Sequence, residues 1–175
     1  VNKLDRENVD FDAVVASIQD VYGSQCVPIV VPIGVSHDLK GVVNVINGDT
    51  SVLGDQAEAF KEAITEAVAE ANDELLEKFL EEGALTDEEF RAGLHDGITT
   101  GKIVPILAGC VSQALGIDDL LDLVAHSFPS PLERHIKVVE KGAEKSITAD
   151  PKAPFLGQVF RSMVDPFVGH LTFFR

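Results

Sequence analysis

The sequence predicts an α/β fold, in which short buried strands alternate with amphipathic helices. Three runs of apolar, mostly β-branched residues have the composition of buried strands: 26–33, 41–46 and 102–107. In the longer stretches around them, apolar residues recur every three or four positions, as in helices that bury one face. The 175 residues, 45% of them hydrophobic, suffice for one domain, or for one domain and part of another.

Start and stop residues bound the predicted helices. Asp10 is a plausible N-cap for the first helix, and Gly23 follows its end. The second stretch is expected to break near Asn72. Thr86 begins a capping box that opens the third helix, which Gly97 is expected to close. The predicted helices cover residues 9–22, 56–82, 86–97 and 117–126.

The C-terminal part of the chain has a different composition. Residues 132–150 are polar and of mixed charge, which is typical of a linker. Residues 155–163 and 168–174 are predicted strands on either side of the turn residues Asp165 and Pro166.

The chain is strongly acidic, with 29 Asp and Glu against 14 Lys and Arg and a net charge of −15. Because binding to a phosphate backbone needs clustered basic residues, we expect no direct nucleic-acid binding by this segment. Residues 54–96 alone carry 14 acidic and 3 basic side chains. This block indicates either a solvated helical surface or a docking face for a basic partner.

Cysteine usage and hydropathy indicate a reduced, cytoplasmic setting. Cys26 and Cys110 stand too far apart in the sequence to suggest a disulfide framework or a metal cluster. No apolar run approaches the length of a membrane span, so no membrane partner is expected. No metal site is predicted in this segment.

Residues Asn2-Lys3-Leu4-Asp5 spell NKxD, the motif with which GTP-binding proteins recognise guanine. A carboxylate at Asp5 can accept from the ring N–H and the exocyclic amine of guanine together, a donor pair that adenine lacks. The Lys3 stem can lie across the base, and Asn2 can tie the loop to neighbouring backbone. The same residue types are also common at an ordinary turn and helix start.

A second segment has the form of a guanine-facing loop. The strand at 102–107 leads through Ala108 into Gly109, Cys110 and Val111, whose backbone N–H groups are predicted to face the base oxygen. An ordinary strand-to-helix turn would have the same local pattern. Residues 97–102 resemble a phosphate-binding loop, but the spacing is one residue short and Ile103 replaces the required hydroxyl.

The order of these segments resembles bacterial elongation factor G along nearly the whole chain. The strongest likeness is at residues 165–175, which are similar to the opening hairpin of the second domain in that family. The other similar stretches are residues 2–6, 10–11, 27–34, 41–43, 72–81, 85–90, 103–107 and 129–132.

The resemblance implies part of a P-loop-type GTP-binding domain with an α+β insertion subdomain, followed by the first strands of a β-barrel domain. Residues 1–131 would be the C-terminal part of the GTP-binding domain, with the insertion at about 24–100. Residues 132–150 would be a linker, and 151–175 the start of the second domain.

The expected function is that of a fragment of a ribosome-associated GTPase in translation elongation, acting in translocation or recycling. The parent would use GTP or GDP with magnesium. The fragment is expected to hold no nucleotide and to be inactive, because it lacks the phosphate-binding loop and switches. Gly109-Cys110-Val111 replaces the usual Gly-Ser-Ala, and the tryptophan often found after 41–43 is missing, which suggests a divergent paralogue.

The resemblance implies partners for the acidic block, namely the ribosome and its stalk protein. Glu77, Glu81 and Glu82 are the predicted docking residues. A ribosomal-protection protein or a class-3 release factor shares this domain plan and remains an alternative. The second alternative is a non-enzymatic acidic docking module without a GTPase parent.

Overall fold

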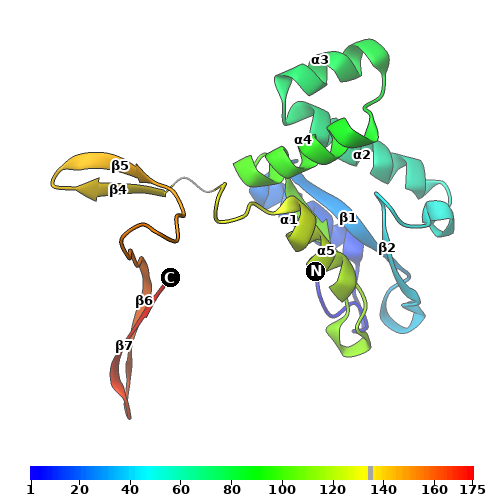
Figure 1. The fold of residues 1–175 in the computed structure, drawn as a ribbon. Helices are drawn as coiled ribbons and strands as arrows, with labels where there is room; N and C mark the ends of the chain where they lie inside the picture. The colour runs from blue at the N-terminus through cyan, green and yellow to red at the C-terminus, as the bar shows by residue number, and fades with distance from the viewer. Residues whose placement is uncertain (134–135) are drawn as a thin grey trace. The chain divides into compact units, whose positions relative to one another are not determined.

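The strand β1, Cys26–Ile33, is the centre of a three-stranded sheet with the order β2-β1-β3. It pairs antiparallel with β2 (Gly41–Asn44) and parallel with β3 (Val104–Leu107). The computed structural model describes residues 1–133 and 136–175, and Figure 1 follows the chain through them. The first six residues of β1 are buried, as expected for an inner strand covered on both faces.

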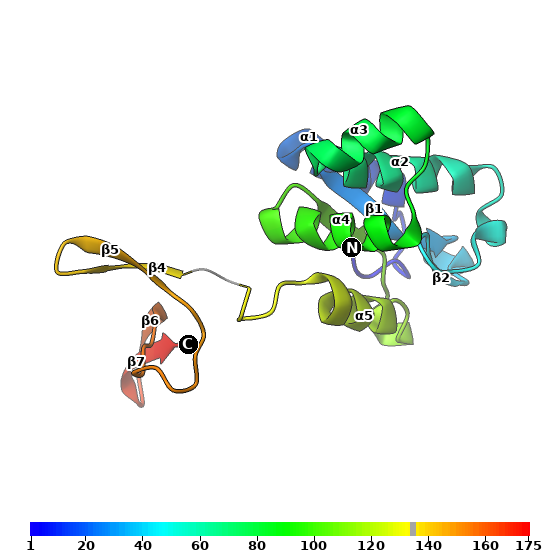
Figure 2. The same ribbon diagram turned by 45° about the horizontal axis from the view of Figure 1, so that its top comes forward.

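Helices pack on this sheet and on one another. α1 and α2 contact β1, α3 and α4 pack on α2, and α5 contacts α4. In Figures 1 and 2, α3 lies farther from β1 than α2 does. The helices are α1 (Phe11–Tyr22), α2 (Gln56–Glu70), α3 (Asp73–Glu82), α4 (Asp87–Thr100) and α5 (Ile117–Ser127).

The predicted helix starts are confirmed by their capping bonds. The Asp10 carboxylate accepts from the Ala13 amide at 3.0 Å. The long helical stretch breaks where expected, because the Asn72 side chain caps a new helix by accepting from the Glu74 amide at 2.9 Å. The capping box between Thr86 and Glu89 is also present.

The predicted end of α4 at Gly97 is wrong. The helix continues to Thr100, and Gly101 ends it in the left-handed conformation with φ of 76°. Gly97 is buried inside the helix instead, where an added Cβ would lie 2.4 Å from Ile103 Cδ1 and 3.3 Å from Ala71 Cβ. This glycine therefore permits close packing and does not stop the helix.

The hydrophobic core of residues Val1–Pro129 lies where α1, α2 and α4 meet the sheet. Leu4, from the loop before α1, is fully buried among these elements. Leu4 anchors the N-terminal loop to the rest of the protein, because a buried leucine is costly to expose to water. Other core side chains come from the sheet and helices: Phe11, Val15, Ile29, Val30, Val31, Ile64, Val68, Leu94 and Ile106.

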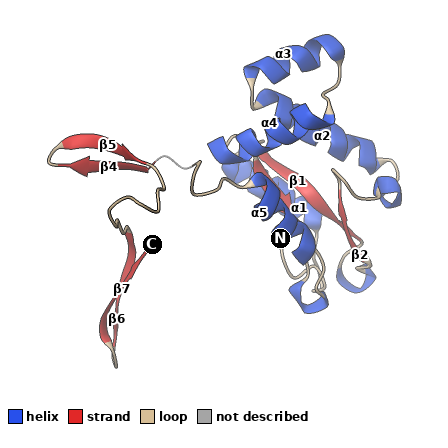
Figure 3. Ribbon diagram, in the orientation of Figure 1, coloured by secondary structure: helices blue, strands red, loops and turns tan. Residues whose placement is uncertain are grey.

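The chain divides into two compact units, Val1–Pro129 and Ser130–Arg175. The second unit contains two antiparallel hairpins, each described here by itself and coloured as strands in Figure 3. One pairs β4 (Ile136–Glu140) with β5 (Ala143–Ile147), and the other pairs β6 (Val159–Asp165) with β7 (Gly169–Phe174).

Two predicted boundaries differ from the structure. The β4–β5 hairpin occupies the stretch that its polar composition predicted to be a linker. Its strands pair in regular register although most of their side chains are exposed, so the hydropathy pattern does not mark them. In addition, β1 belongs to the same sheet as β3, whereas the prediction placed β1 inside an insertion that starts near residue 24.

Candidate functional site

The two predicted guanine-recognition segments meet in the structure. The Val1 amine donates to the Leu107 carbonyl at 2.6 Å, and the Gly109 amide donates to the Val1 carbonyl at 2.9 Å. This pair of bonds is the pattern of a parallel β-bridge at the outer edge of β3. It carries the following residues, Asn2 to Asp5, past the loop that begins at Gly109.

Asn2 ties the NKxD loop to the second segment, as the sequence predicted. Its side-chain oxygen accepts from the Lys3 amide at 2.7 Å and from the Val111 amide at 3.2 Å. The first bond accompanies a left-handed backbone at Lys3, with φ of 66°. Together the two bonds fix the course of the loop, and the side chains of Asn2 and Lys3 remain exposed.

The Asp5 carboxylate contacts a residue that the sequence interpretation missed. Ser112 Oγ donates to Asp5 Oδ2 at 3.0 Å. The Ser112 hydroxyl, and after it the Cys110 thiol, lower the pKa of the Asp5 carboxyl, so that it is held in the charged form. No motif marks Ser112, which lies just beyond the predicted loop.

The predicted role of the backbone at Gly109, Cys110 and Val111 needs correction. Each of their three amides already has an acceptor within the chain: the Val1 carbonyl, the Leu115 carbonyl and the Asn2 side chain. The last of these bonds, at 3.2 Å and between exposed groups, is the easiest to exchange. A base oxygen would therefore have to displace Asn2 from Val111 before it could accept from this loop.

The segment that resembles a phosphate-binding loop has another role here. Gly97 to Thr100 form the last turn of α4. Lys102 Nζ donates to the Ala71 carbonyl at 2.7 Å, at the C-terminal end of α2. A cation is favourable at that end because the last carbonyls of a helix carry partial negative charge. The lysine thus joins α2 to the residues that lead into β3.

A groove of about 690 Å³ runs beside the Asn2 corner. It follows the outer edge of β3, between α1 on one side and α5 on the other. Its walls are mostly apolar, and they include the exposed side chains of Tyr22 and Leu120. Asn2, Gly109 and Val111 are among its lining residues, so the groove adjoins the predicted guanine-recognition segments.

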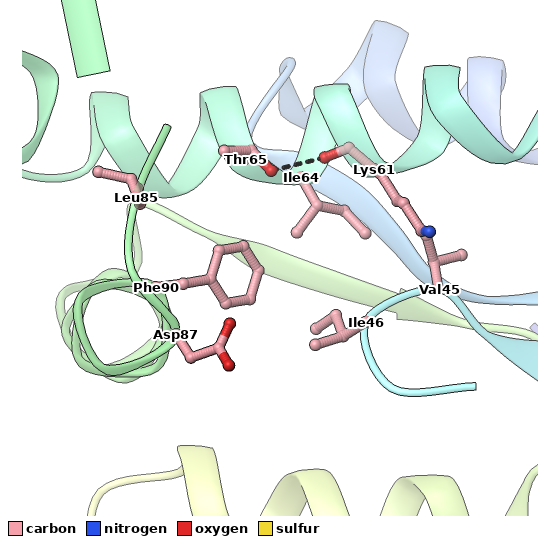
Figure 4. A pocket seen from close by; sticks show the side chains of 8 residues that line it. All are labelled: Val45, Ile46, Lys61, Ile64, Thr65, Leu85, Asp87 and Phe90. Carbon is pink, nitrogen blue, oxygen red and sulfur yellow. Dashed lines mark hydrogen bonds between the residues drawn. The ribbon is translucent and has the colours of Figure 1, made fainter. Parts of the chain in front are cut away.

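A smaller pocket of about 240 Å³ lies between α2, the start of α4 and the turn after β2. Figure 4 shows the side chains of Ile46, Ile64 and Phe90 pointing toward one another. Lys61 and Asp87 also line the pocket. None of the predicted site residues lines this pocket.

The predicted docking residues Glu77, Glu81 and Glu82 lie exposed on α3. Glu82 is 3.8 Å from Lys78 Nζ, so its charge is partly balanced. Lys78 also pairs with Glu89 on α4 and joins the two helices. The structure therefore leaves Glu77 and Glu81 as the more available charges of this group.

Cys26 and Cys110 are both buried and not joined to each other. Within residues 1–133 and 136–175, no cluster of three or more His, Cys, Asp or Glu has the arrangement of a metal site. In the same residues, no helix has both the length and the apolar character needed to cross a membrane.

Comparison with known proteins supports the mixed α/β fold. No family model matches the chain. A protein from Thermus thermophilus, known from its crystal structure, is similar over the whole of this chain, at 25% sequence identity and a TM-score of 0.73. The chain spans 26% of the length of that protein.

Proposed function

We propose that these residues are part of an elongation-factor-G-like translational GTPase, in which Asn2, Lys3 and Asp5 recognise the guanine base. The observation that carries the proposal is the assembly of the NKxD loop on the 109–112 loop, through Asn2 and Asp5. An ordinary turn would not need a partner 107 to 109 residues away in the chain.

In this proposal Asp5 gives the site its selectivity. Its carboxylate is charged and lies at the surface of the corner, where it can accept from both guanine donors. Lys3 has an exposed side chain in the same loop and can cover the base with its methylene stem. The Val111 amide would then exchange Asn2 for the base oxygen, which releases the Asn2 side chain for further contacts.

The open edge of β3 supports the finer fold proposal of a partial P-loop-type domain. Val1 pairs with this edge in parallel, and the apolar groove beside it lies between two helices. Inner strands of parallel sheets are flanked by apolar helix faces in this way. The relative from Thermus, of which the chain spans 26%, is correspondingly larger. The β6–β7 hairpin would begin the β-barrel domain.

In the parent, GTP or GDP and magnesium would be held by a phosphate-binding loop and switches, for which this segment has no matching motif. The parent would act in the cytoplasm, on the ribosome, in translocation or recycling.

The test uses nuclear magnetic resonance of the 175-residue protein with nucleosides. Guanosine should shift the signals of Asn2, Asp5 and residues 109–112, with a dissociation constant of about 1 mM or weaker, because few contacts form. Adenosine and xanthosine should leave these signals unshifted. In Asp5→Asn the preference should move to xanthosine, whose carbonyl accepts from an amide. Equal shifts with all three nucleosides would reject the proposal.

GDP tests whether the phosphate site lies outside these residues. It should bind no more tightly than guanosine, because phosphate contributes only where donors or cations meet it. Micromolar binding of GDP by this protein would show that the segment holds phosphate after all.

The proposed docking of the stalk protein on α3 has a separate test. Reversing the exposed charges, Glu77→Lys with Glu81→Lys, should weaken binding, most clearly at low salt. The control is Glu58→Lys, an acidic residue in the first turn of α2. An affinity that stays constant across the salt series would contradict a charge-dependent docking face.

A further inference from the structure

The Asp5 carboxylate stands at the end of a line of three side chains that runs from the core to the surface. Cys110, at the inner end, is fully buried. Its sulfur lies 3.1 Å from Ser112 Oγ, which in turn lies 3.0 Å from Asp5 Oδ2. A buried side chain is thereby linked to the exposed carboxylate of the NKxD loop.

The charge on Asp5 determines which group donates to it in this line. A serine hydroxyl has a single proton, and the charged carboxylate can only accept, so Ser112 donates to Asp5. With the serine proton used in this way, the Cys110 thiol can donate to the Ser112 oxygen across their contact, and it also lowers the pKa of Asp5 as a hydrogen-bond partner. Each donor is strengthened by the one behind it, because an accepting hydroxyl becomes a better donor.

We propose that Ser112, oriented by Cys110, is a positioning residue that fixes the Asp5 carboxylate for a ligand with two adjacent N–H donors. The inference rests on the proposed function, since guanine is such a ligand. Rotation of a carboxylate about its terminal bond is broad when nothing holds it. Ser112 holds Oδ2 in place, so the carboxylate is oriented before such a ligand arrives.

The benefit to binding is preorganisation. A carboxylate that is already oriented loses less freedom when the ligand arrives. A second hydrogen bond supports this arrangement, because the Asn2 side chain joins the same two loops independently of Ser112. Removing the Ser112 hydroxyl should therefore free the carboxylate without separating the loops.

The first measurement needs no ligand. The Asp5 carboxyl is titrated by carbon-detected magnetic resonance in the 175-residue protein and its variants. In Ser112→Ala the pKa of Asp5 should rise toward its ordinary value, and in Ser112→Thr, which keeps the hydroxyl, it should stay low. Cys110→Ser keeps the inner donor and should resemble the unmodified protein, whereas Cys110→Ala should give a smaller rise than Ser112→Ala.

Ser36→Ala is the matched control. Its hydroxyl donates to the Arg6 carbonyl at 2.7 Å and so anchors the same N-terminal loop without contacting Asp5. It should leave the Asp5 titration unchanged. A role in loop stability alone would make Ser36→Ala and Ser112→Ala alike, and that result would overturn the proposal. An Asp5 titration that is the same in Ser112→Ala and in the unmodified protein would overturn it too.

The second measurement is guanosine affinity. Ser112→Ala should bind roughly three- to tenfold more weakly, as for the loss of one charge-assisted hydrogen bond, and Ser112→Thr should bind as before. If no variant binds guanosine while the titrations behave as stated, the proposed function fails but the positioning of Asp5 stands. Unchanged guanosine affinity in Ser112→Ala would reject the contribution of Ser112 to binding.

Discussion

The Lys78 ammonium group binds the Glu89 carboxylate and thereby joins α3 to α4. Glu89 is at the same time the second partner of the capping box at Thr86. Its pKa is lowered to about 2, first by Lys78 and then by the Thr86 amide and hydroxyl. A single carboxylate thus holds a helix start and an interhelical contact together.

We predict that the Glu89 carboxylate makes the stability of α3 and α4 depend on pH. A group whose pKa is lower in the folded state stabilises that state above its unfolded pKa, near 4.5 here. This contribution is then lost as the pH falls toward 2. Glu89→Gln should therefore be less stable than the unmodified protein at pH 7, and the difference should shrink between pH 5 and pH 2.

Denaturant titrations at a series of pH values measure this effect. Glu81→Gln, on the exposed face of α3, is the control and should follow the unmodified protein throughout. A stability difference for Glu89→Gln that stays constant down to pH 2 would contradict the role of its charge.

We predict that Leu4→Ala destabilises the first unit by about 2–5 kcal/mol, because Leu4 is fully buried and its loss leaves a cavity. Leu80→Ala, at a position that is 76% exposed, should change the stability by less than about 0.5 kcal/mol. Urea denaturation followed by circular dichroism compares the two variants. Equal effects would show that Leu4 does not anchor the loop.

We predict that Gly97→Ala destabilises the protein by roughly 1–3 kcal/mol, through overpacking against Ile103. The sign of this stability change is informative, because a glycine-to-alanine substitution at an open helical position would stabilise the protein by about 1 kcal/mol. Ile103→Val removes the nearest atom, Cδ1, so the cost of Gly97→Ala should be smaller in that background. A double-mutant cycle with no coupling would rule out the contact as the cause.

We predict that Asn2→Ala speeds hydrogen exchange at the Val111 amide and costs up to about 1 kcal/mol, because this amide loses its acceptor. Asn2→Asp keeps an acceptor oxygen and should leave the exchange slow. Exchange measured residue by residue separates the two variants. Slow exchange in Asn2→Ala would mean that the loop is closed without this side chain.

We predict fast hydrogen exchange in the β6–β7 hairpin at low protein concentration. Two strands without further partners are marginal in water, and both faces of this hairpin carry exposed apolar side chains, such as Val164 on one face and Phe173 on the other. At high concentration the open edges should pair between molecules and slow the exchange. Protection equal to that of β1 in dilute solution would contradict this expectation.

The sequence predicted the strands and helix starts that depend only on residues close together in the chain. The apolar run at Cys26–Ile33 predicted β1 with its observed bounds, Asp10 and Thr86 cap the helices they were expected to cap, and the long helical stretch breaks at Asn72 as expected. Gly97 was misinterpreted because a glycine that stops a helix and one that admits a neighbour look the same in sequence. The difference lies in Ile103, which only the fold brings near.

The candidate site shows the same limit. The motif identified Asn2 and Asp5, and the strand-loop pattern identified Gly109 to Val111. The hydrogen bond from Ser112 to Asp5 depends on how far the second loop turns after Val111, and no periodicity encodes that. The amides of that loop were expected to face a base oxygen, but Val1, Leu115 and Asn2 accept from them in the folded chain.

The contact between Val1 and Gly109 also limits when the N-terminal loop can fold during synthesis of the chain. A ribosome adds roughly 5–20 residues per second, so about 5 to 20 s pass between the synthesis of Val1 and that of Gly109. During this interval the NKxD loop has no partner to close against, and Leu4 has no complete core to enter. The corner is therefore one of the last parts of the first unit that can form as the nascent chain grows.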